Sequence, residues 1–134
     1  MQKSFVKEFK LYCKKKNLDV NSHQIKLIKT LEEYYKLNYK SFISKILSKK
    51  NYKKGFYLYG DVGVGKTMIL DFFFNLVEGK KLKLHFNEFM LSFHDFVHQS
   101  KDKNDENKLS KFVKKLKSKA KLIYFDEFQV TNIV

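Results

Sequence analysis

Apolar side chains recur at helical spacing in three runs before residue 50, and each run predicts a helix. The three stripes are Phe5, Phe9 and Tyr12; Ile25, Ile28, Leu31 and Tyr35; and Phe42, Ile43, Ile46 and Leu47. The second run carries a start signal, because Asn21 or Ser22 can act as the N-cap and Gln24 stands at the capping-box position. The polar stretch 48–54 ends the third run. We therefore expect an N-terminal helical segment over residues 1–50.

Short apolar runs alternate with helical stripes in the rest of the chain. The predicted strands are GFYLYG (55–60), KLKLHF (81–86) and LIYF (122–125). The predicted helices are Thr67 to Val77, a helix with the stripe Phe89, Phe93, Phe96 and Val97, and, after a polar loop at 99–108, a helix with the stripe Leu109, Phe112, Val113 and Leu116. Strands that alternate with helices pair in parallel through crossover connections. The expected fold class is therefore α/β.

The segment GDVGVGKT (60–67) matches the pattern G-x-x-x-x-G-K-[ST] between a predicted strand and a predicted helix. Its glycines allow a tight turn in which successive backbone N–H groups face a polyphosphate, and the following helix adds the positive end of its dipole. Lys66 can reach the β- and γ-phosphates, and the Thr67 hydroxyl can ligate Mg²⁺. The residues expected to contact the nucleotide are Gly60, Asp61, Val62, Gly63, Val64, Gly65, Lys66, Thr67 and Met68.

A second motif, LIYFDE (122–127), ends an apolar strand with two carboxylates. Asp126 stands at the carboxyl end of the predicted strand, where ligands of open α/β sheets bind, and can hold Mg²⁺ through water. Glu127 is free to act as a general base on the attacking water. The two motifs together predict hydrolysis of ATP as well as binding. Lys66 and Glu127 are then the catalytic residues, and Thr67 and Asp126 are the metal ligands.

Composition limits the class of protein. The chain has 134 residues, 43% of them hydrophobic, and a mean hydropathy of −0.47, which is typical of a globular domain. No apolar run approaches the roughly 20 residues of a membrane span, and the first residues lack the apolar core of a signal peptide. The single Cys13 excludes an internal disulfide and fits a reducing compartment and an inert thiol. We expect a cytoplasmic protein.

The formal net charge of +14 raises the question of a nucleic-acid partner. All 28 basic residues are lysine, whereas base readout and bidentate phosphate binding rely on arginine. A chain rich in lysine and lacking arginine, proline and tryptophan is typical of an AT-rich genome. A basic surface for an acidic partner, nucleic acid or anionic lipid is the alternative that stays open.

Three histidines resemble part of a metal site, since His94 and His98 are one helical turn apart and His85 precedes them. No carboxylate or cysteine completes a convincing set of ligands. We interpret all three as packing and surface residues.

Three sequence blocks in the same order resemble the ZapE family of AAA+ ATPases. These are bacterial division-associated ATPases, related to the mitochondrial lactation-elevated-protein ATPases. The blocks are GFYLYGDVGVGKTMILDFFF, LHFNEFMLSFHDFVH and LIYFDEFQVTNI, and the resemblance covers residues 20–134. It implies an ATP and Mg²⁺ site made of Gly60, Gly65, Lys66, Thr67, Asp126 and Glu127. The middle block matches at His85, Phe86, Phe89, Met90 and His94. Asn87 and Asn132 depart from the family, which usually has His and Asp there.

The resemblance further implies a P-loop sheet of the AAA+ type, of which residues 51–134 would be the N-terminal half. In that family another strand lies between the strand of Asp126 and the P-loop strand, and this chain ends before it. We therefore expect an incomplete sheet, truncated after the Asp126 strand, in an N-terminal fragment of a longer ATPase. No arginine is present to act as a finger. The chain alone is expected to be inactive.

By the same resemblance, the whole protein would assemble into a ring-like oligomer and act on a division-machinery protein of the FtsZ type or on other protein clients. It would have no membrane span, and peripheral association with a membrane stays open. A helicase loader or replication initiator shares the core motifs and would use the lysine surface on nucleic acid, although FQVTN (128–132) disfavours it. A third alternative is a nucleotide-binding module that does not hydrolyse ATP.

Overall fold

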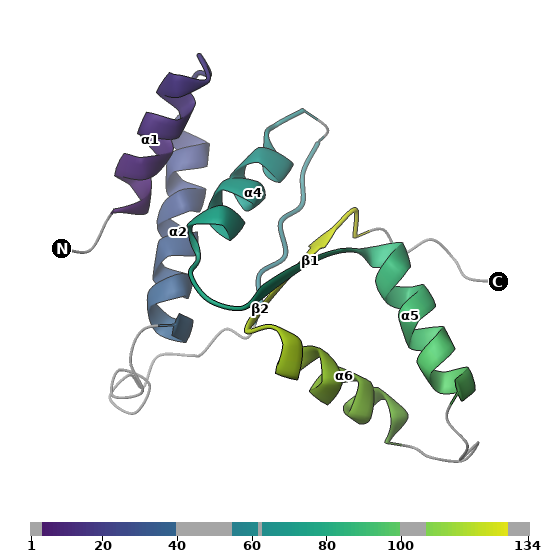
Figure 1. The fold of residues 1–134 in the computed structure, drawn as a ribbon. Helices are drawn as coiled ribbons and strands as arrows, with labels where there is room; N and C mark the ends of the chain where they lie inside the picture. The colour runs from purple at the N-terminus through teal and green to yellow at the C-terminus, as the bar shows by residue number, and fades with distance from the viewer. Residues whose placement is uncertain (1–3, 40–54, 62, 100–106, 129–134) are drawn as a thin grey trace. The chain divides into compact units, whose positions relative to one another are not determined.

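The computed structural model describes residues 4–39, 55–61, 63–99 and 107–128. The chain divides into two compact units, Met1–Val77 and Glu78–Val134. The positions of the parts relative to one another are not determined, so each unit is described by itself (Figure 1). The predicted helix with Phe42 and the polar stretch 48–54 lie outside the described residues.

Among its described residues, the first unit packs the helices α1 (Phe5–Lys15), α2 (Ser22–Tyr39) and α4 (Lys66–Leu76). Its core includes Phe9, Ile28 and Leu31 from the predicted stripes, and other buried residues that those stripes did not contain. The most deeply buried side chains are Phe9, Cys13, Ile28, Leu31, Ile69 and Val77. The ring of Phe9 meets Phe72 edge-to-face at a centroid distance of 5.0 Å, which joins α1 to α4. All three helices predicted within the described part of this unit are confirmed.

The start of α2 is the predicted capping box. The Gln24 backbone N–H donates to Asn21 Oδ1 at 2.8 Å, and the Asn21 N–H donates to Gln24 Oε1 at 3.1 Å. Two backbone donors that the helix itself cannot satisfy are therefore paired reciprocally. Of the two residues that the sequence allowed as N-cap, Asn21 takes the role.

In the part of the second unit that the structure describes, two parallel strands are joined by two helices. Strand β1 (Lys81–His85) is followed by α5 (Phe86–Gln99), α6 (Lys108–Lys119) and β2 (Leu122–Asp126). The strands pair in register from Lys81 opposite Leu122 to His85 opposite Asp126. This confirms parallel strands with crossover helices, an α/β arrangement. The sequence pattern predicted that the strand would include Phe86. In the structure β1 ends at His85, and Phe86 begins α5.

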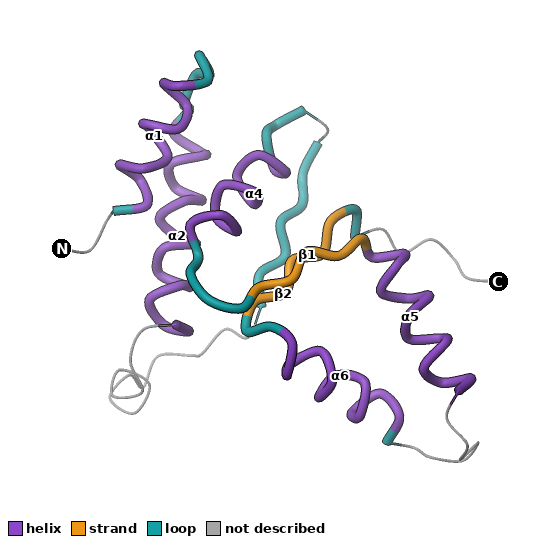
Figure 2. Tube along the Cα trace, in the orientation of Figure 1, coloured by secondary structure: helices purple, strands orange, loops and turns teal. Residues whose placement is uncertain are grey.

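One predicted strand is wrong. Residues 55–60 are extended but form no strand, and Figure 2 draws them as a loop that leads toward α4. Their side chains are largely outside the core: Tyr57 is 65% exposed and Tyr59 is 81% exposed. A strand needs a neighbour to satisfy its backbone groups. Within the described residues, the only hydrogen-bonded ladder is the one between β1 and β2.

Cys13 is fully buried on α1. Burial raises the pKa of its thiol above the ordinary value, because a thiolate would lose its hydration there. Within the described ranges, none of the helices combines the length and the apolar character that a membrane span requires.

Candidate nucleotide-binding site

The loop between residue 60 and α4 has the backbone that its glycines predicted. Gly63 and Gly65 have φ angles of 85° and 83°, in the left-handed region that other residues seldom adopt. These angles fold the loop back on itself before the helix begins. Val62, one of the predicted contact residues, lies outside the described residues.

Gly65 is the N-cap of α4, and its carbonyl accepts the first helical hydrogen bond from the Ile69 N–H at 3.0 Å. No side chain caps this helix. The first N–H groups of a helix have no partner within it and lie at the positive end of its dipole. The start of α4 therefore offers backbone donors to an anion, and the loop residues lead directly into them.

The Lys66 side chain turns back across the loop that precedes it. Its Nζ donates to the Gly60 carbonyl at 2.7 Å and also to the Asp61 carbonyl. The ammonium group is thus held on the same side of the loop as Gly60. The carbonyl oxygens that accept these hydrogen bonds are neutral. Phosphate oxygens are charged and therefore bind an ammonium group more strongly than carbonyl oxygens do.

Thr67 and Met68 complete the first turn of α4. Thr67 is exposed, so its hydroxyl is open to a ligand or an ion. Met68 is half-buried, and its Cε lies 3.4 Å from the position that a Cβ would occupy on Gly65. Gly65 therefore needs to be glycine for its backbone angle, and a side chain there would also press against its neighbours.

In the second unit, Asp126 ends β2 as predicted. Its Oδ1 accepts the Glu127 N–H at 3.1 Å and the Tyr124 hydroxyl at 3.4 Å. Its Oδ2 is 3.3 Å from Lys83 Nζ on β1. Three donors, from β1, from β2 and from the residue that follows β2, therefore hold the carboxylate at the carboxyl end of the sheet.

Glu127 follows in a left-handed conformation, with φ 51°, and is exposed. The chain turns sharply after Asp126, so the two neighbouring carboxylates have different surroundings. The Asp126 side chain is held by hydrogen bonds, whereas Glu127 is open to solvent. A fixed carboxylate such as Asp126 suits a metal ligand, and a solvent-exposed carboxylate such as Glu127 suits a general base that acts on water.

Lys83 was missed by the sequence reasoning. Lysine and leucine alternate along β1, so Lys81 and Lys83 share one face of the strand and Leu82 shares the other with Leu84. Lys83 stands opposite Tyr124 in the ladder, and its Nζ lies 4.9 Å from that ring's centroid. The alternation was the available signal, but its partner could be named only once the register was known.

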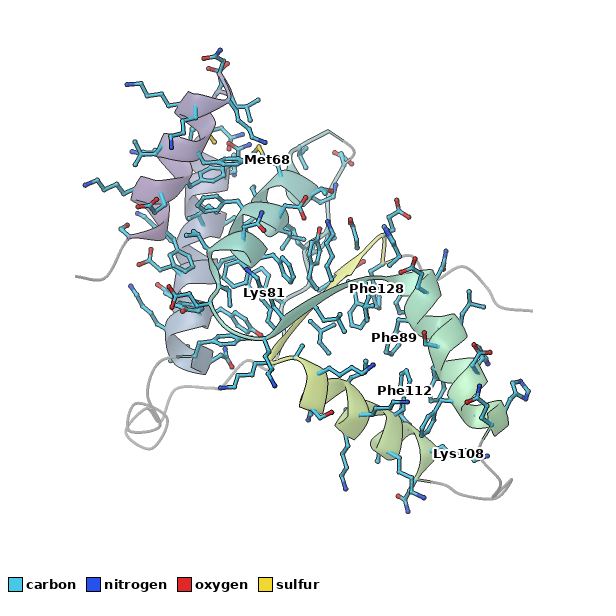
Figure 3. All side chains as sticks on the ribbon, in the orientation of Figure 1. Met68, Lys81, Phe89, Lys108, Phe112 and Phe128 are labelled. Atoms are coloured by element: carbon cyan, nitrogen blue, oxygen red, sulfur yellow. The ribbon has the colours of Figure 1, made fainter. Side chains whose placement is uncertain are left out.

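The aromatic residues of the middle sequence block support the end of β2. The Phe86 ring is 4.3 Å from the Phe128 ring, and Phe89 meets Phe125 edge-to-face at 4.9 Å. Phe89 also contacts Phe112 of α6 at 5.6 Å (Figure 3). This cluster brackets Asp126 and Glu127 between two packed phenylalanines. The sequence alone gave no role to Phe86 and Phe89. The structure shows that both pack around the end of β2.

The two histidines of that block, His85 and His94, are both exposed. Across the ranges that the structure describes, no group of three or more His, Cys, Asp or Glu side chains could hold a metal ion by itself. The predicted ATP-contacting residues belong to the first unit, and Asp126 and Glu127 belong to the second. The phosphate-loop residues and the two carboxylates are therefore each described within their own unit.

Comparison with protein families matches residues 9–134 to the family described as AFG1-like ATPase. The match covers most of the chain and includes both motifs. This chain belongs to the AFG1-like ATPase family. Lactation elevated protein 1 homolog B of Danio rerio is 38% identical over 96 residues, which are 64% of this chain and 19% of that protein.

Cell division protein ZapE of Escherichia coli K12 is 35% identical to this AFG1-like chain over 81 residues, 60% of this chain and 21% of that protein. The chain thus spans about a fifth of the length of the curated relatives that it matches. No solved structure matches it. The resemblance to the ZapE and lactation-elevated ATPases is confirmed.

Proposed function

We propose that this chain supplies the ATP- and Mg²⁺-binding part of an AAA+ ATPase that converts ATP to ADP and phosphate. The observation that carries the proposal is the pair of left-handed glycines, Gly63 and Gly65, that leads into the start of α4, with Lys66 Nζ reaching back to the Gly60 carbonyl. Membership of the AFG1-like family supports the same reading.

Each residue has a distinct part in the proposed reaction. The N–H groups of the loop and of the first turn of α4 bind phosphate oxygens, and Lys66 exchanges its carbonyl contacts for the β- and γ-phosphates. Thr67 and Asp126 hold Mg²⁺, for which hydroxyl and carboxylate oxygens are suitable ligands. When bound, Mg²⁺ neutralises charge on the transferring phosphoryl group. Glu127 orients and deprotonates the attacking water.

The donors present fit this assignment. The Thr67 hydroxyl is exposed at the start of a helix, and the Asp126 carboxylate is half-buried and held in place by Tyr124 and by the backbone of Glu127. Lys83 lies within ion-pair distance of Asp126 and adds a third contact that fixes the position of this carboxylate.

The test is equilibrium binding of ATP, measured by calorimetry with and without Mg²⁺. Lys66→Ala is expected to lose affinity for ATP by a factor of about 100, because the principal phosphate cation is gone. Lys10→Ala removes an exposed lysine from α1 and is expected to bind like wild type. Equal affinity in wild type and Lys66→Ala would overturn the proposed site.

We extend the proposal to the whole protein through its relatives. By its resemblance to AAA+ ATPases, we propose that the complete ATPase forms a ring-like oligomer, and the Escherichia coli relative is named a cell division protein. We further propose that it acts on a division-machinery protein of the FtsZ type or on another protein client. Co-sedimentation of the complete protein with such polymers, with and without ATP, tests this. Absence of ATP-dependent co-sedimentation would remove the division-machinery partner.

A further inference from the structure

The Gln24 side chain lies beside the candidate phosphate loop, although it belongs to the capping box of α2. Its Nε2 is 3.3 Å from the position that a Cβ would occupy on Gly65. The side chain is half-buried. Its Oε1 is already engaged by the Asn21 N–H, which fixes the direction of the amide and turns the NH₂ group toward Gly65. The cap therefore positions a hydrogen-bond donor next to the loop.

This donor lies beside Gly65, whereas Lys66 contacts Gly60 at the other end of the loop. The Lys66 side chain lies against Gly60, with its Cδ 4.0 Å from that residue's Cβ position. Gln24 and Met68 are the two side chains against Gly65. We expect a nucleotide whose terminal phosphates meet Lys66 to run past Gly65 and the phosphate-binding N–H groups of α4, so that its base lies beyond them. Gln24 and Met68 are then the nearest polar and apolar groups to the base.

The two groups suit a purine. The Met68 thioether is flexible and polarisable, so it packs well against a ring. A glutamine amide pairs with the N7 and N6 atoms of adenine, donating to N7 and accepting from N6. Within the described residues, Nε2 of Gln24 makes no hydrogen bond, whereas Oε1 still has a second lone pair.

We propose that Gln24 recognises the adenine base by donating a hydrogen bond from Nε2 to N7, with the capping box of α2 holding it in position. The inference rests on the proposed ATP site and adds the residue that selects the base. It also gives Asn21 and Gln24 a joint role: the pair that begins α2 aligns the donor.

The test compares ATP with 7-deaza-ATP, in which a C–H replaces N7, by calorimetric titration of this chain. Wild type is expected to bind ATP about five- to tenfold more tightly than 7-deaza-ATP, the usual worth of one hydrogen bond. In Gln24→Glu and Gln24→Ala, the ratio is expected to fall to about one or below. His23→Ala, an exposed neighbour on α2, is expected to keep the wild-type ratio.

Gln24→Glu separates recognition from folding, because a glutamate at this position caps the Asn21 N–H as well as glutamine does. Its unfolding midpoint is expected to equal that of wild type. A ratio near one in wild type, or a wild-type ratio retained in Gln24→Glu, would overturn the inference and leave the phosphate site standing. If wild type binds neither nucleotide, the proposed function fails and this inference fails with it.

Discussion

Lys83 Nζ lies 3.3 Å from Asp126 Oδ2, across the two parallel strands of the second unit. The pair is partly solvated, with the two side chains 37% and 20% exposed. It couples the carboxylate proposed as a metal ligand to a cation that Mg²⁺ would meet as a competitor. If Asp126 binds Mg²⁺ as proposed, we expect Lys83 to affect the Mg²⁺ requirement as well as the position of Asp126.

Replacing Lys83 by glutamine is expected to lower the Mg²⁺ concentration needed for half-maximal ATP binding by about two- to fivefold, since a partly screened positive charge is removed. The stability of the fold should change by less than about 1 kcal/mol, as for other solvated ion pairs. A Mg²⁺ titration at fixed ATP measures the first quantity, and urea unfolding measures the second. Lys81→Gln, on the same face of β1, is the matched control. A higher Mg²⁺ requirement in Lys83→Gln would show that the lysine aids metal binding.

Glu127→Gln in the full-length ATPase is expected to keep ATP affinity and to lose hydrolysis by about 100-fold or more, because only the base that activates water is removed. Single-turnover hydrolysis and nucleotide binding are measured on the same preparation, beside Lys66→Ala. A matching loss of ATP affinity in both variants would contradict the role given to Glu127.

Gly65→Ala is expected to weaken ATP binding strongly and to cost about 1–2 kcal/mol of stability, because alanine is strained at a left-handed φ. The new Cβ would also meet Gln24 Nε2 at 3.3 Å. Gly63→Ala has the strain but open space around its Cβ, so its effect should be smaller. Gly55→Ala has open space and no left-handed φ, and should be nearly neutral. Thermal unfolding and ATP titration of the three variants check this order.

Cys13 is expected to react with a thiol reagent much more slowly in the native chain than in urea. Its thiol is buried, and this burial raises its folded pKa above the ordinary value. The unfolded thiol then loses its proton first as pH rises through about 9, so the unfolded state binds fewer protons and stability falls there. Labelling rates and urea unfolding at pH 8 and pH 10 test both statements. Cys13→Ala should flatten the alkaline part of the profile.

Binding to duplex DNA tests what the lysines do. If the charge of +14 reflects composition alone, affinity should be weak and indifferent to sequence, and should fall steeply with salt. Fluorescence anisotropy between about 50 and 200 mM salt measures this. Specific binding that persists at the higher salt, with turnover stimulated by DNA in the complete protein, would favour the helicase-loader alternative.

Local sequence determined those features that depend on neighbouring residues. The Asn21–Gln24 capping box and the left-handed glycines before α4 both arise within a few residues, so spacing and residue type were enough to predict them. The strands that begin at Lys81 and at Leu122 followed from short apolar runs of the right length. The motif residues Lys66, Asp126 and Glu127 were found in the same way, although their chemical roles remain proposals.

Tertiary structure decided what depends on partners distant in the chain. The run at 55–60 has the composition of a strand, but a strand exists only where a second chain segment satisfies its backbone. Lys83 was matched with Asp126 by the register of two strands, and Gln24 with Gly65 by the packing of α2 against the start of α4. Periodicity reports which face of an element is apolar, but it contains no information on which distant residue will lie against that face.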